Sequence, residues 1–215
     1  MPPTIPALTE HAVCSVAHGL GRVLSQDQAH SLRIYLDLLV KWNQRMNLVG
    51  PGAWPEIVET LIQDSWHLAD LLHSQGLTPR YTLDLGAGAG LPGIPMRMFW
   101  TQGEYFLVEP RHKRAIFMDQ ALVTLGLSRT RVLCMRMEDL GQEYRQAELI
   151  VSRAFKPWQN LLGDVRSYLA PGGQVVIMTT SPQPAQPVHG YSLRHVAPYV
   201  VQGKNRFFWL FAVEK

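Results

Sequence analysis

Glycines and carboxylates follow two short apolar runs in a pattern that suits a nucleotide-like ligand. The apolar run at 81–85 leads into a loop with four glycines, Gly86, Gly88, Gly90 and Gly93. Glycines after a buried strand let the backbone turn sharply and approach a ligand, and a following helix start offers free N–H groups. A second apolar run ends at Glu109. Its carboxylate can accept hydrogen bonds from both hydroxyls of a ribose.

Three ligands or roles fit this loop: a dinucleotide, S-adenosylmethionine, or a purely structural turn. The spacing G-x-G-x-x-G from 88 to 93 satisfies the dinucleotide fingerprint, which is a weak signal by itself. Asp84 favours S-adenosylmethionine, because a carboxylate can bind the cationic amino group of the methionine moiety but repels a pyrophosphate. Pro92 and Pro95 stiffen the loop where a pyrophosphate-binding helix would begin. A Pro-Gly-Gly turn within 169–173 is typical of methyltransferases, so we expect S-adenosylmethionine as the cofactor.

The elements that position this loop are predicted by apolar runs that alternate with helical segments. Expected strands lie at 81–85, 104–109, 131–135, 148–151 and 174–178, with a helix at 111–126. The chain ends in two extended stretches, 191–201 and 205–213, whose Gln-Gly-Lys connection indicates a hairpin. This order predicts an α/β fold, a Rossmann-like class I methyltransferase sheet that is mostly parallel with a C-terminal antiparallel hairpin.

The first part of the chain has helical patterns and no strand pattern. Leu32, Tyr35, Leu36 and Leu39 recur at helical spacing after Ser25, which is a suitable N-cap. A second helix is expected from about 55 to 73. We therefore predict an N-terminal helical extension at 1–79 and a methyltransferase domain at 80–215. The extension is expected to serve RNA recognition rather than donor binding.

The composition describes a globular chain with a packed core. It has 215 residues, of which 47% are hydrophobic and 17% charged. The net charge of +3 does not by itself indicate nucleic-acid binding, although Arg, which suits phosphates and base stacking, outnumbers Lys. Cys14 and Cys134 show no metal-ligand spacing, so we expect no metal. Because the chain shows no signal-peptide pattern and no apolar run of ~20 residues, we expect a cytoplasmic protein. We also expect a monomer.

Several blocks of the chain, taken together, resemble the RsmG (GidB) family. The most specific is Asp84–Pro95, with its Leu-Pro-Gly-Ile-Pro ending. The other similar blocks are Trp42–Leu48, Asp64-Ser65, Glu109 with Lys113-Arg114 and Phe117, Arg136–Glu138, and Val151–Phe155. The resemblance runs from about residue 36 to 178. It departs at Thr60 and Leu61, where the family has Arg-His, and at 179–182, where a Lys-Gly pair is expected.

The resemblance implies methyl transfer from S-adenosylmethionine to guanine N7 of 16S ribosomal RNA, free or in the small ribosomal subunit. It also implies donor contacts at Gly86, Leu91, Met137 and Glu138. Physical reasoning adds Asp84, Gly88 and Glu109 to the cofactor-binding residues. Arg153 ends the fourth strand, where ligands bind in open α/β sheets, and the resemblance implies a catalytic role and a donor contact. The ordinary alternatives are a core methionine at 137, a helix-start carboxylate at 138 and an ion-pair arginine at 153.

The chemistry of guanine N7 needs few side chains, because its lone pair is free and no proton has to leave. Positioning can then supply the rate without a dedicated base. RNA binding is expected from Arg111, Lys113 and Arg114 beside the cleft and from Lys41 and Arg45, although such residues can also form solvated helix faces. Trp42 either stacks on RNA or packs between regions. The competing functions are a small-molecule methyltransferase with a helical lid and a donor-binding protein without turnover.

Overall fold

The computed structural model describes residues 5–214 and contains a seven-stranded sheet with the order β3-β2-β1-β4-β5-β7-β6. The strands are β1 Tyr81–Leu85, β2 Glu104–Val108, β3 Thr130–Leu133, β4 Ala147–Arg153, β5 Leu169–Thr179, β6 Tyr191–Val201 and β7 Lys204–Val213. β1 to β5 pair in parallel, whereas β7 pairs antiparallel with β5 and with β6. The predicted mostly parallel sheet with a C-terminal hairpin is confirmed.

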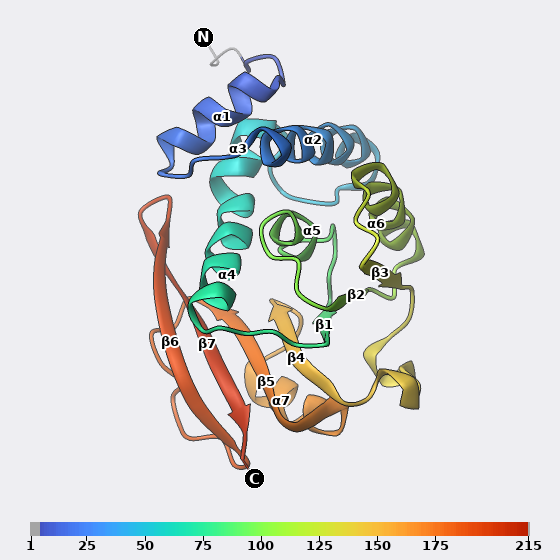
Figure 1. Cartoon of the computed structure of the whole chain (residues 1–215), viewed down its shortest axis with the longest axis vertical. Coiled ribbons are helices and arrows are strands. Elements are labelled where there is room, and N and C mark those ends of the chain that lie inside the picture. Colours follow the sequence, from blue (N-terminus) through green and yellow to red (C-terminus); the bar gives the residue numbers. More distant parts are fainter. Residues whose placement is uncertain (1–4, 215) are drawn as a thin grey trace.

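Helices cover both faces of the sheet (Figure 1). They are α1 Glu10–Gly19, α2 Gln26–Met46, α3 Trp54–Ile57, α4 Gln63–Ser74, α5 Gly93–Arg97, α6 His112–Leu125 and α7 Trp158–Val165. Side chains alternate across β1, β2 and β4, because successive residues of a strand point to opposite faces. Leu107 and Val151 therefore pack toward α4, α5 and α6, while Leu83 and Ile150 pack toward α7.

The N-terminal helices pack directly onto the sheet domain. α2 lies across the upper part of Figure 1, below α1, above α5 and beside α6. Its start is the predicted cap, since Ser25 and Gln28 form a reciprocal capping box. Tyr35 and Trp42 of α2 contact Phe117 of α6, with ring centroids 6.3 and 5.8 Å apart. Residues on both sides of the predicted boundary at 79 and 80 thus share one hydrophobic core.

The helix expected from about 55 to 73 is continuous but irregular. α3 runs into a π-helical turn at Val58–Ile62, which runs into α4. Thr60 and Leu61, where the chain departs from the RsmG pattern, lie in that turn. Single π turns inside α-helices are frequent at functional sites, because the extra residue re-aims the side chains that follow it. Asp64, whose side chain is buried, lies two residues after this turn.

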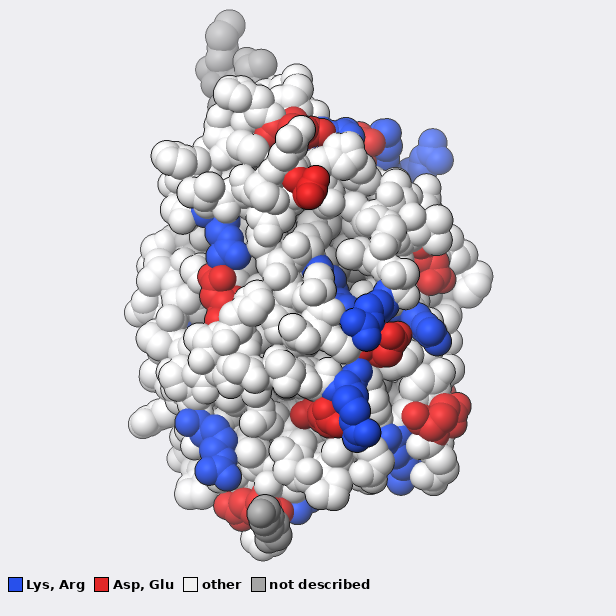
Figure 2. All heavy atoms as spheres, viewed as in Figure 1, with Lys and Arg blue, Asp and Glu red and all other residues white. Residues whose placement is uncertain are grey.

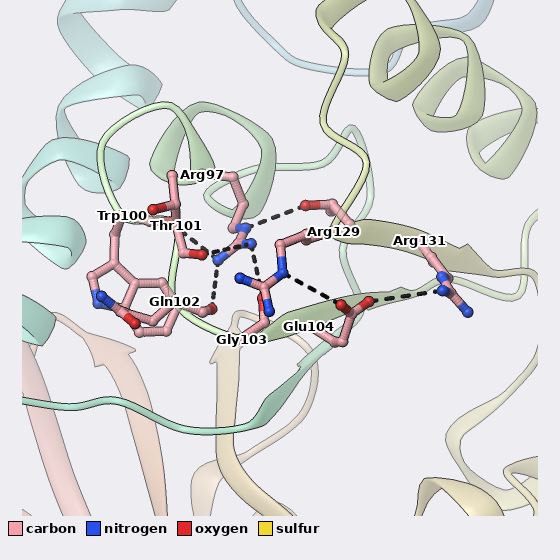
Figure 3. Close-up of polar contacts among 9 residues, drawn as sticks. Arg97, Trp100, Thr101, Gln102, Gly103, Glu104, Arg129 and Arg131 are labelled. Atoms are coloured by element: carbon pink, nitrogen blue, oxygen red, sulfur yellow. Dashed lines mark hydrogen bonds and ion pairs between the residues drawn. The ribbon is translucent and has the colours of Figure 1, made fainter.

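A buried arginine holds the turn between α5 and β2 (Figure 3). Arg97 is only 3% exposed, yet its guanidinium donates to the carbonyl oxygens of Gln102 (2.7 Å) and Gly103 (3.0 Å). It also donates to the hydroxyl of Thr130 at the start of β3 (3.2 Å). These acceptors offset the cost of burying a cation that has no carboxylate partner among the described residues. α5 therefore ends at a fixed point beside β2 and β3.

The C-terminal hairpin closes with Gln202 and Gly203, both of which have positive φ angles, 48° and 70°. Such angles at both central positions are those of a tight two-residue hairpin turn, which Gly adopts easily. None of the helices within residues 5–214 is long and apolar enough to cross a membrane. In the same residues, no group of three or more His, Cys, Asp or Glu side chains is placed to hold a metal ion.

Candidate functional site

The glycine loop forms one wall of a pocket of about 330 Å³ at the carboxyl ends of β1 and β4. Four of the predicted cofactor-binding residues line it, namely Gly86, Gly88, Leu91 and Arg153. The opposite wall comes from the N-terminal region, through 48–50 and Leu61. Part of the N-terminal region thus borders the predicted donor pocket, and the expectation that residues 1–79 serve RNA recognition rather than donor binding stays a prediction.

Gly86 lies close to the segment that follows β4. Its φ angle is +74°, and a Cβ atom added there would lie 2.7 Å from the ring of Phe155. Any larger residue at 86 would therefore strain the backbone and collide with the segment that follows β4. Gly88 also has a positive φ of 61°, but the nearest atom to its virtual Cβ is an Arg114 nitrogen 3.5 Å away. Gly88 thus faces open space beside a guanidinium.

Glu109 follows β2, and its carboxylate binds the backbone of the glycine loop. Its side chain is 5% exposed, and its two oxygens accept backbone N–H groups of Gly88 and Arg111, each at 3.0 Å. Arg114 lies 3.9 Å from the same carboxylate. The predicted ribose acceptor is therefore held at the strand end, next to the glycine loop, by two adjacent segments of backbone. The negative charge that it carries is balanced by Arg114.

Asp84 lies inside the sheet rather than in the pocket wall. It is 1% exposed and accepts a hydrogen bond from the Tyr105 hydroxyl at 2.9 Å. Burial raises the pKa of Asp84 to about 7, while the Tyr105 hydrogen bond and the positive charge of Arg153 lower it. A Cβ at Gly93 would lie 2.5 Å from the carboxylate, so glycine at 93 leaves room for Asp84. The predicted contact to the donor amino group remains a prediction.

Arg153 belongs to an ionic cluster around the buried carboxylate of Asp64. The Arg153 Nε atom lies 3.5 Å from Asp64 Oδ2, and Arg153 keeps 25% of its side chain exposed at the pocket. Arg206 of β7 and Tyr199 of β6 donate to Asp64 Oδ1 at 2.5 and 3.0 Å. Asp64 is 1% exposed, so two guanidinium groups and a hydroxyl compensate its charge. The sequence prediction had Arg153 but missed Arg206 and Tyr199.

Met137 and Glu138 lie apart from the residues that line this pocket. Met137 begins a short 3₁₀ turn, Met137–Asp139, and is 4% exposed in the core that faces α7. Glu138 is 61% exposed and lies 3.5 Å from Lys156, which also binds Asp164. Lys156 was not predicted. It links the 137–139 turn to the segment after β4, two residues beyond the alanine at 154 that lines the pocket.

A tyrosine of the N-terminal region supports the loop from above. The Tyr35 hydroxyl donates to the carbonyl oxygen of Ala89 at 2.7 Å, and Tyr35 is fully buried. Tyr35 was predicted only as a core position of its helix. A hydroxyl at such a position has to find a partner once buried. That requirement is the one signal in the sequence for a polar contact here, and it does not identify the partner.

The basic residues predicted to bind RNA lie in three different places. Lys41, Arg45 and Lys113 line a single groove of about 670 Å³ between α2 and α6, although we predicted two separate patches. Arg114 lines the glycine pocket instead. Arg111 is the exposed N-cap residue of α6. On the face shown in Figure 2, basic and acidic side chains adjoin one another, so local grooves describe the charge better than the net value does.

Comparisons with solved structures agree with this fold. A putative O-methyltransferase from Klebsiella pneumoniae superposes with a TM-score of 0.61 at 16% identity, over 96% of this chain and 99% of that one. The magnesium protoporphyrin IX methyltransferase from Synechocystis PCC 6803, solved with bound SAM, gives a TM-score of 0.60 at 12% identity, over 90% of this chain and 100% of that one. At these identities the likeness concerns the fold.

Comparisons of sequence are more specific. The chain is 46% identical to the ribosomal RNA small subunit methyltransferase G of Nitratidesulfovibrio vulgaris (strain DP4), over 81% of each chain. It is 39% identical to the protein of the same name from Oleidesulfovibrio alaskensis, over 91% of this chain and 90% of that one. Residues 28–190 match the family model described as GidB, rRNA small subunit methyltransferase G. The chain therefore belongs to the GidB family of small-subunit ribosomal RNA methyltransferases.

Proposed function

We propose that this S-adenosylmethionine-dependent methyltransferase transfers a methyl group to the N7 atom of a guanine in 16S ribosomal RNA. The observation that carries the proposal is the ionisable content of the glycine pocket. Of the residues that line it, only Arg114 and Arg153 carry ionisable side chains. Arginine stays protonated in proteins, so neither can act as a general base. A pocket without a base suits an acceptor that loses no proton.

The methyl donor fits the residues that surround this pocket. Glycine at 86 and 88 keeps the loop free of side chains, and we assign donor contacts to Gly86, Gly88 and Leu91. Glu109, held beside the loop, is the proposed acceptor for the ribose hydroxyls. Asp84, Met137 and Glu138 complete the proposed cofactor-binding residues. The donor, when bound, supplies an electrophilic methyl group on a sulfonium centre.

Arg153 is the proposed catalytic residue of the pocket. Its guanidinium is planar and can donate two parallel hydrogen bonds to a carboxylate or a phosphate. The Asp64 contact holds one side of that group, and the exposed remainder of the side chain faces the pocket. Arg153 thus positions a ligand and takes no proton. The positioning of the acceptor accounts for the rate enhancement that we expect.

The RNA is proposed to contact the basic residues around the pocket. Arg111, Lys113 and Arg114 come from the start of α6, and Lys41 and Arg45 come from α2. Contacts of this kind go to phosphate oxygens and fix the register of the RNA without reading its sequence. Because each neutralised phosphate releases counterions, binding should weaken steeply with added salt.

Transfer of a labelled methyl group to ribosomal RNA tests the proposal. Naked 16S RNA and purified small subunits are incubated with the full chain and labelled S-adenosylmethionine, and the product is digested to nucleosides for mass spectrometry. We expect 7-methylguanosine as the only labelled nucleoside. A product methylated on an exocyclic amine or a ribose would overturn the N7 assignment. Donor binding without any RNA product, or transfer only to small molecules, would overturn the RNA assignment.

A further inference from the structure

We propose that the groove between the C-terminal half of α2 and the start of α6 binds an unpaired nucleotide of the RNA substrate. This inference rests on the proposed RNA function and extends it to the form of RNA that is recognised. Three apolar side chains form the floor of the groove, those of Trp42, Met46 and Ile116. Three cations form its rim, Lys41, Arg45 and Lys113.

The floor is a fixed apolar surface. The indole N–H of Trp42 already donates to Gln120 Oε1 at 3.0 Å, and its ring packs edge-on against Phe117. Trp42 is thereby held in place and presents carbon atoms to the groove. Ile116 is 43% exposed there, although it belongs to a helix whose neighbouring side chains are buried. The groove volume of about 670 Å³ lies within the range of about 300–1,000 Å³ seen for organic ligands.

Two of the three cations on the rim have no matching carboxylate. Lys41 binds Asp37 at 2.7 Å, but Arg45 and Lys113 have no acidic group within 4.0 Å among the described residues. Lys113 also lies in the first turn of α6, which holds no acidic side chain. Cations near a helix N-terminus are unfavourable, because the helix dipole is positive there. A bound phosphate would relieve that repulsion, and phosphates are the anions that RNA offers.

The groove and the glycine pocket are adjacent. Lys113 lines the groove, while Arg114, the next residue, lines the pocket. Met46 lines the groove, while Leu48, two residues on, lines the pocket. Consecutive Cα atoms are about 3.8 Å apart, so two chain segments connect the sites over one or two residues. A nucleobase that meets the donor beside the pocket and a neighbouring nucleobase in the groove can therefore belong to one strand.

The apolar floor favours an unpaired base over a duplex. Inside an RNA duplex, the faces of the bases are stacked on one another and cannot reach a protein surface. Unpaired nucleotides can splay their bases onto aromatic or apolar side chains while cations hold the backbone. Such stacking tolerates every base, because each has a π-face. Gln44, which also lines the groove, adds an amide that can bind the edge of a base.

Two charge insertions on the same helix test the groove. Ile116→Glu places a carboxylate in the floor, whereas Val123→Glu places one outside the groove at a position that is 83% exposed. With 16S RNA as substrate, we expect Ile116→Glu to raise KM at least tenfold and Val123→Glu to change it less than twofold. Calorimetric affinity for S-adenosylmethionine should be unchanged in both variants. A wild-type KM in Ile116→Glu overturns the proposal.

A direct binding measurement separates unpaired from paired RNA. A fluorescein-labelled single-stranded RNA of eight nucleotides is titrated by anisotropy, and the same strand is then titrated as a duplex. We expect tighter binding of the single strand, and a weaker preference in Ile116→Ala, which removes one of the three floor side chains without adding charge. Equal or tighter binding of the duplex overturns the proposal. If the wild type gives no methylated RNA at all, the proposed function fails instead.

Discussion

The orientation of the Arg153 side chain depends on residues that are far away in the sequence. Its place at the end of β4 follows from the sequence, because the carboxyl ends of parallel strands form the binding edge of such sheets. Its orientation depends on Asp64, a carboxylate 1% exposed on α4. A buried carboxylate needs cationic partners, so Asp64 and Arg153 stabilise each other.

Replacement of Arg153 tests its proposed role. Arg153→Ala should lower single-turnover methyl transfer to ribosomal RNA at least tenfold, which corresponds to about 1.4 kcal/mol of transition-state stabilisation. Arg153→Lys should recover little, because a point charge does not reproduce the planar fork. Thermal melts of each variant check that it is folded. A folded Arg153→Ala protein with wild-type turnover would reduce Arg153 to a structural ion pair with Asp64.

Asp84 gives a pH dependence whose sign can be stated. Burial raises its pKa to about 7, so the folded protein holds this proton more tightly than the unfolded chain does. The stabilisation is complete below the ordinary carboxyl pKa of about 4 and is lost as the pH rises through about 7. Asp84→Asn keeps the neutral form and can still accept the Tyr105 hydrogen bond. It should melt like the wild type near pH 4 and be more stable above pH 7, by roughly 1–4 kcal/mol.

The same variant tests the proposed donor contact of Asp84. If its carboxylate binds the donor amino group, wild-type affinity for S-adenosylmethionine should rise between pH 6 and pH 8, and Asp84→Asn should lose that rise. An exposed carboxyl exchange, Asp139→Asn, serves as the control. Identical pH profiles in the wild type and Asp84→Asn would assign Asp84 to the interior alone. The sequence motif could not distinguish these roles, since it reports the strand position and not the burial.

At the scale of elements, the C-terminal hairpin reaches the site that the helices and central strands build. Arg206 and Tyr199 come from β7 and β6, outside the matched residues 28–190, and contact a helix residue at least 135 positions earlier. Arg206 also donates to the carbonyl oxygen of Thr60 in the π-helical turn, at 3.3 Å. The RsmG pattern has an arginine where this chain has Thr60. The guanidinium of Arg206 lies beside that position.

Arg206 should therefore act as a positioning residue for Arg153. Arg206→Ala leaves Asp64 with fewer donors and allows Arg153 to turn inward, so we expect methyl transfer to fall about three- to tenfold while donor affinity changes little. Arg206→Lys should restore part of the rate. In a double-mutant cycle, adding Arg206→Ala to Arg153→Ala should cost nothing further, because the effect acts through Arg153. Additive losses in the double variant would contradict this relation.

The control for Arg206 is another ion-paired arginine away from the pocket. Arg80 is 85% exposed and pairs with Glu148 beside the amino-terminal end of β1. Exposed ion pairs contribute little to stability because water screens them, so Arg80→Ala should leave transfer and melting nearly unchanged.

The strands and long helices were predictable, and the short irregular elements were not. Runs such as 81–85 are apolar and bounded by turn residues, so local pattern alone identifies them. The π-helical turn at Val58–Ile62 has no local signal, because it depends on packing around the helix. α5, of five residues, ends at Arg97, whose contacts are shown in Figure 3; most of them are local, but one reaches the hydroxyl of Thr130, far along the chain. Pattern therefore predicts elements, while their ends and irregularities depend on tertiary contacts.

At the scale of the whole molecule, the predicted division at 79 and 80 describes sequence character better than it describes packing. Buried residues before the boundary, among them Leu36, Ile62 and Leu68, belong to the same hydrophobic cluster as Leu107 and Phe208 of the sheet. The hydrogen bond from Tyr35 to Ala89 crosses the boundary at the glycine loop. A change in periodicity along the sequence marks where strands begin, and it does not measure how much apolar surface the two parts share.

A truncated chain from Leu77 to the end tests this view. Removing α1 to α4 uncovers Phe117, which packs against Tyr35 and Trp42, and Tyr199, which packs against His67, and takes away the partner of the Ala89 carbonyl. Domains are stable by only about 5–15 kcal/mol, so the loss of this apolar burial should prevent stable folding. We therefore expect no cooperative thermal transition, strong binding of a hydrophobic dye, and no measurable donor binding, whereas the full chain melts cooperatively. A truncated protein with a sharp transition and full donor affinity would show that residues 80–215 form an independent domain, and that the helices are an extension.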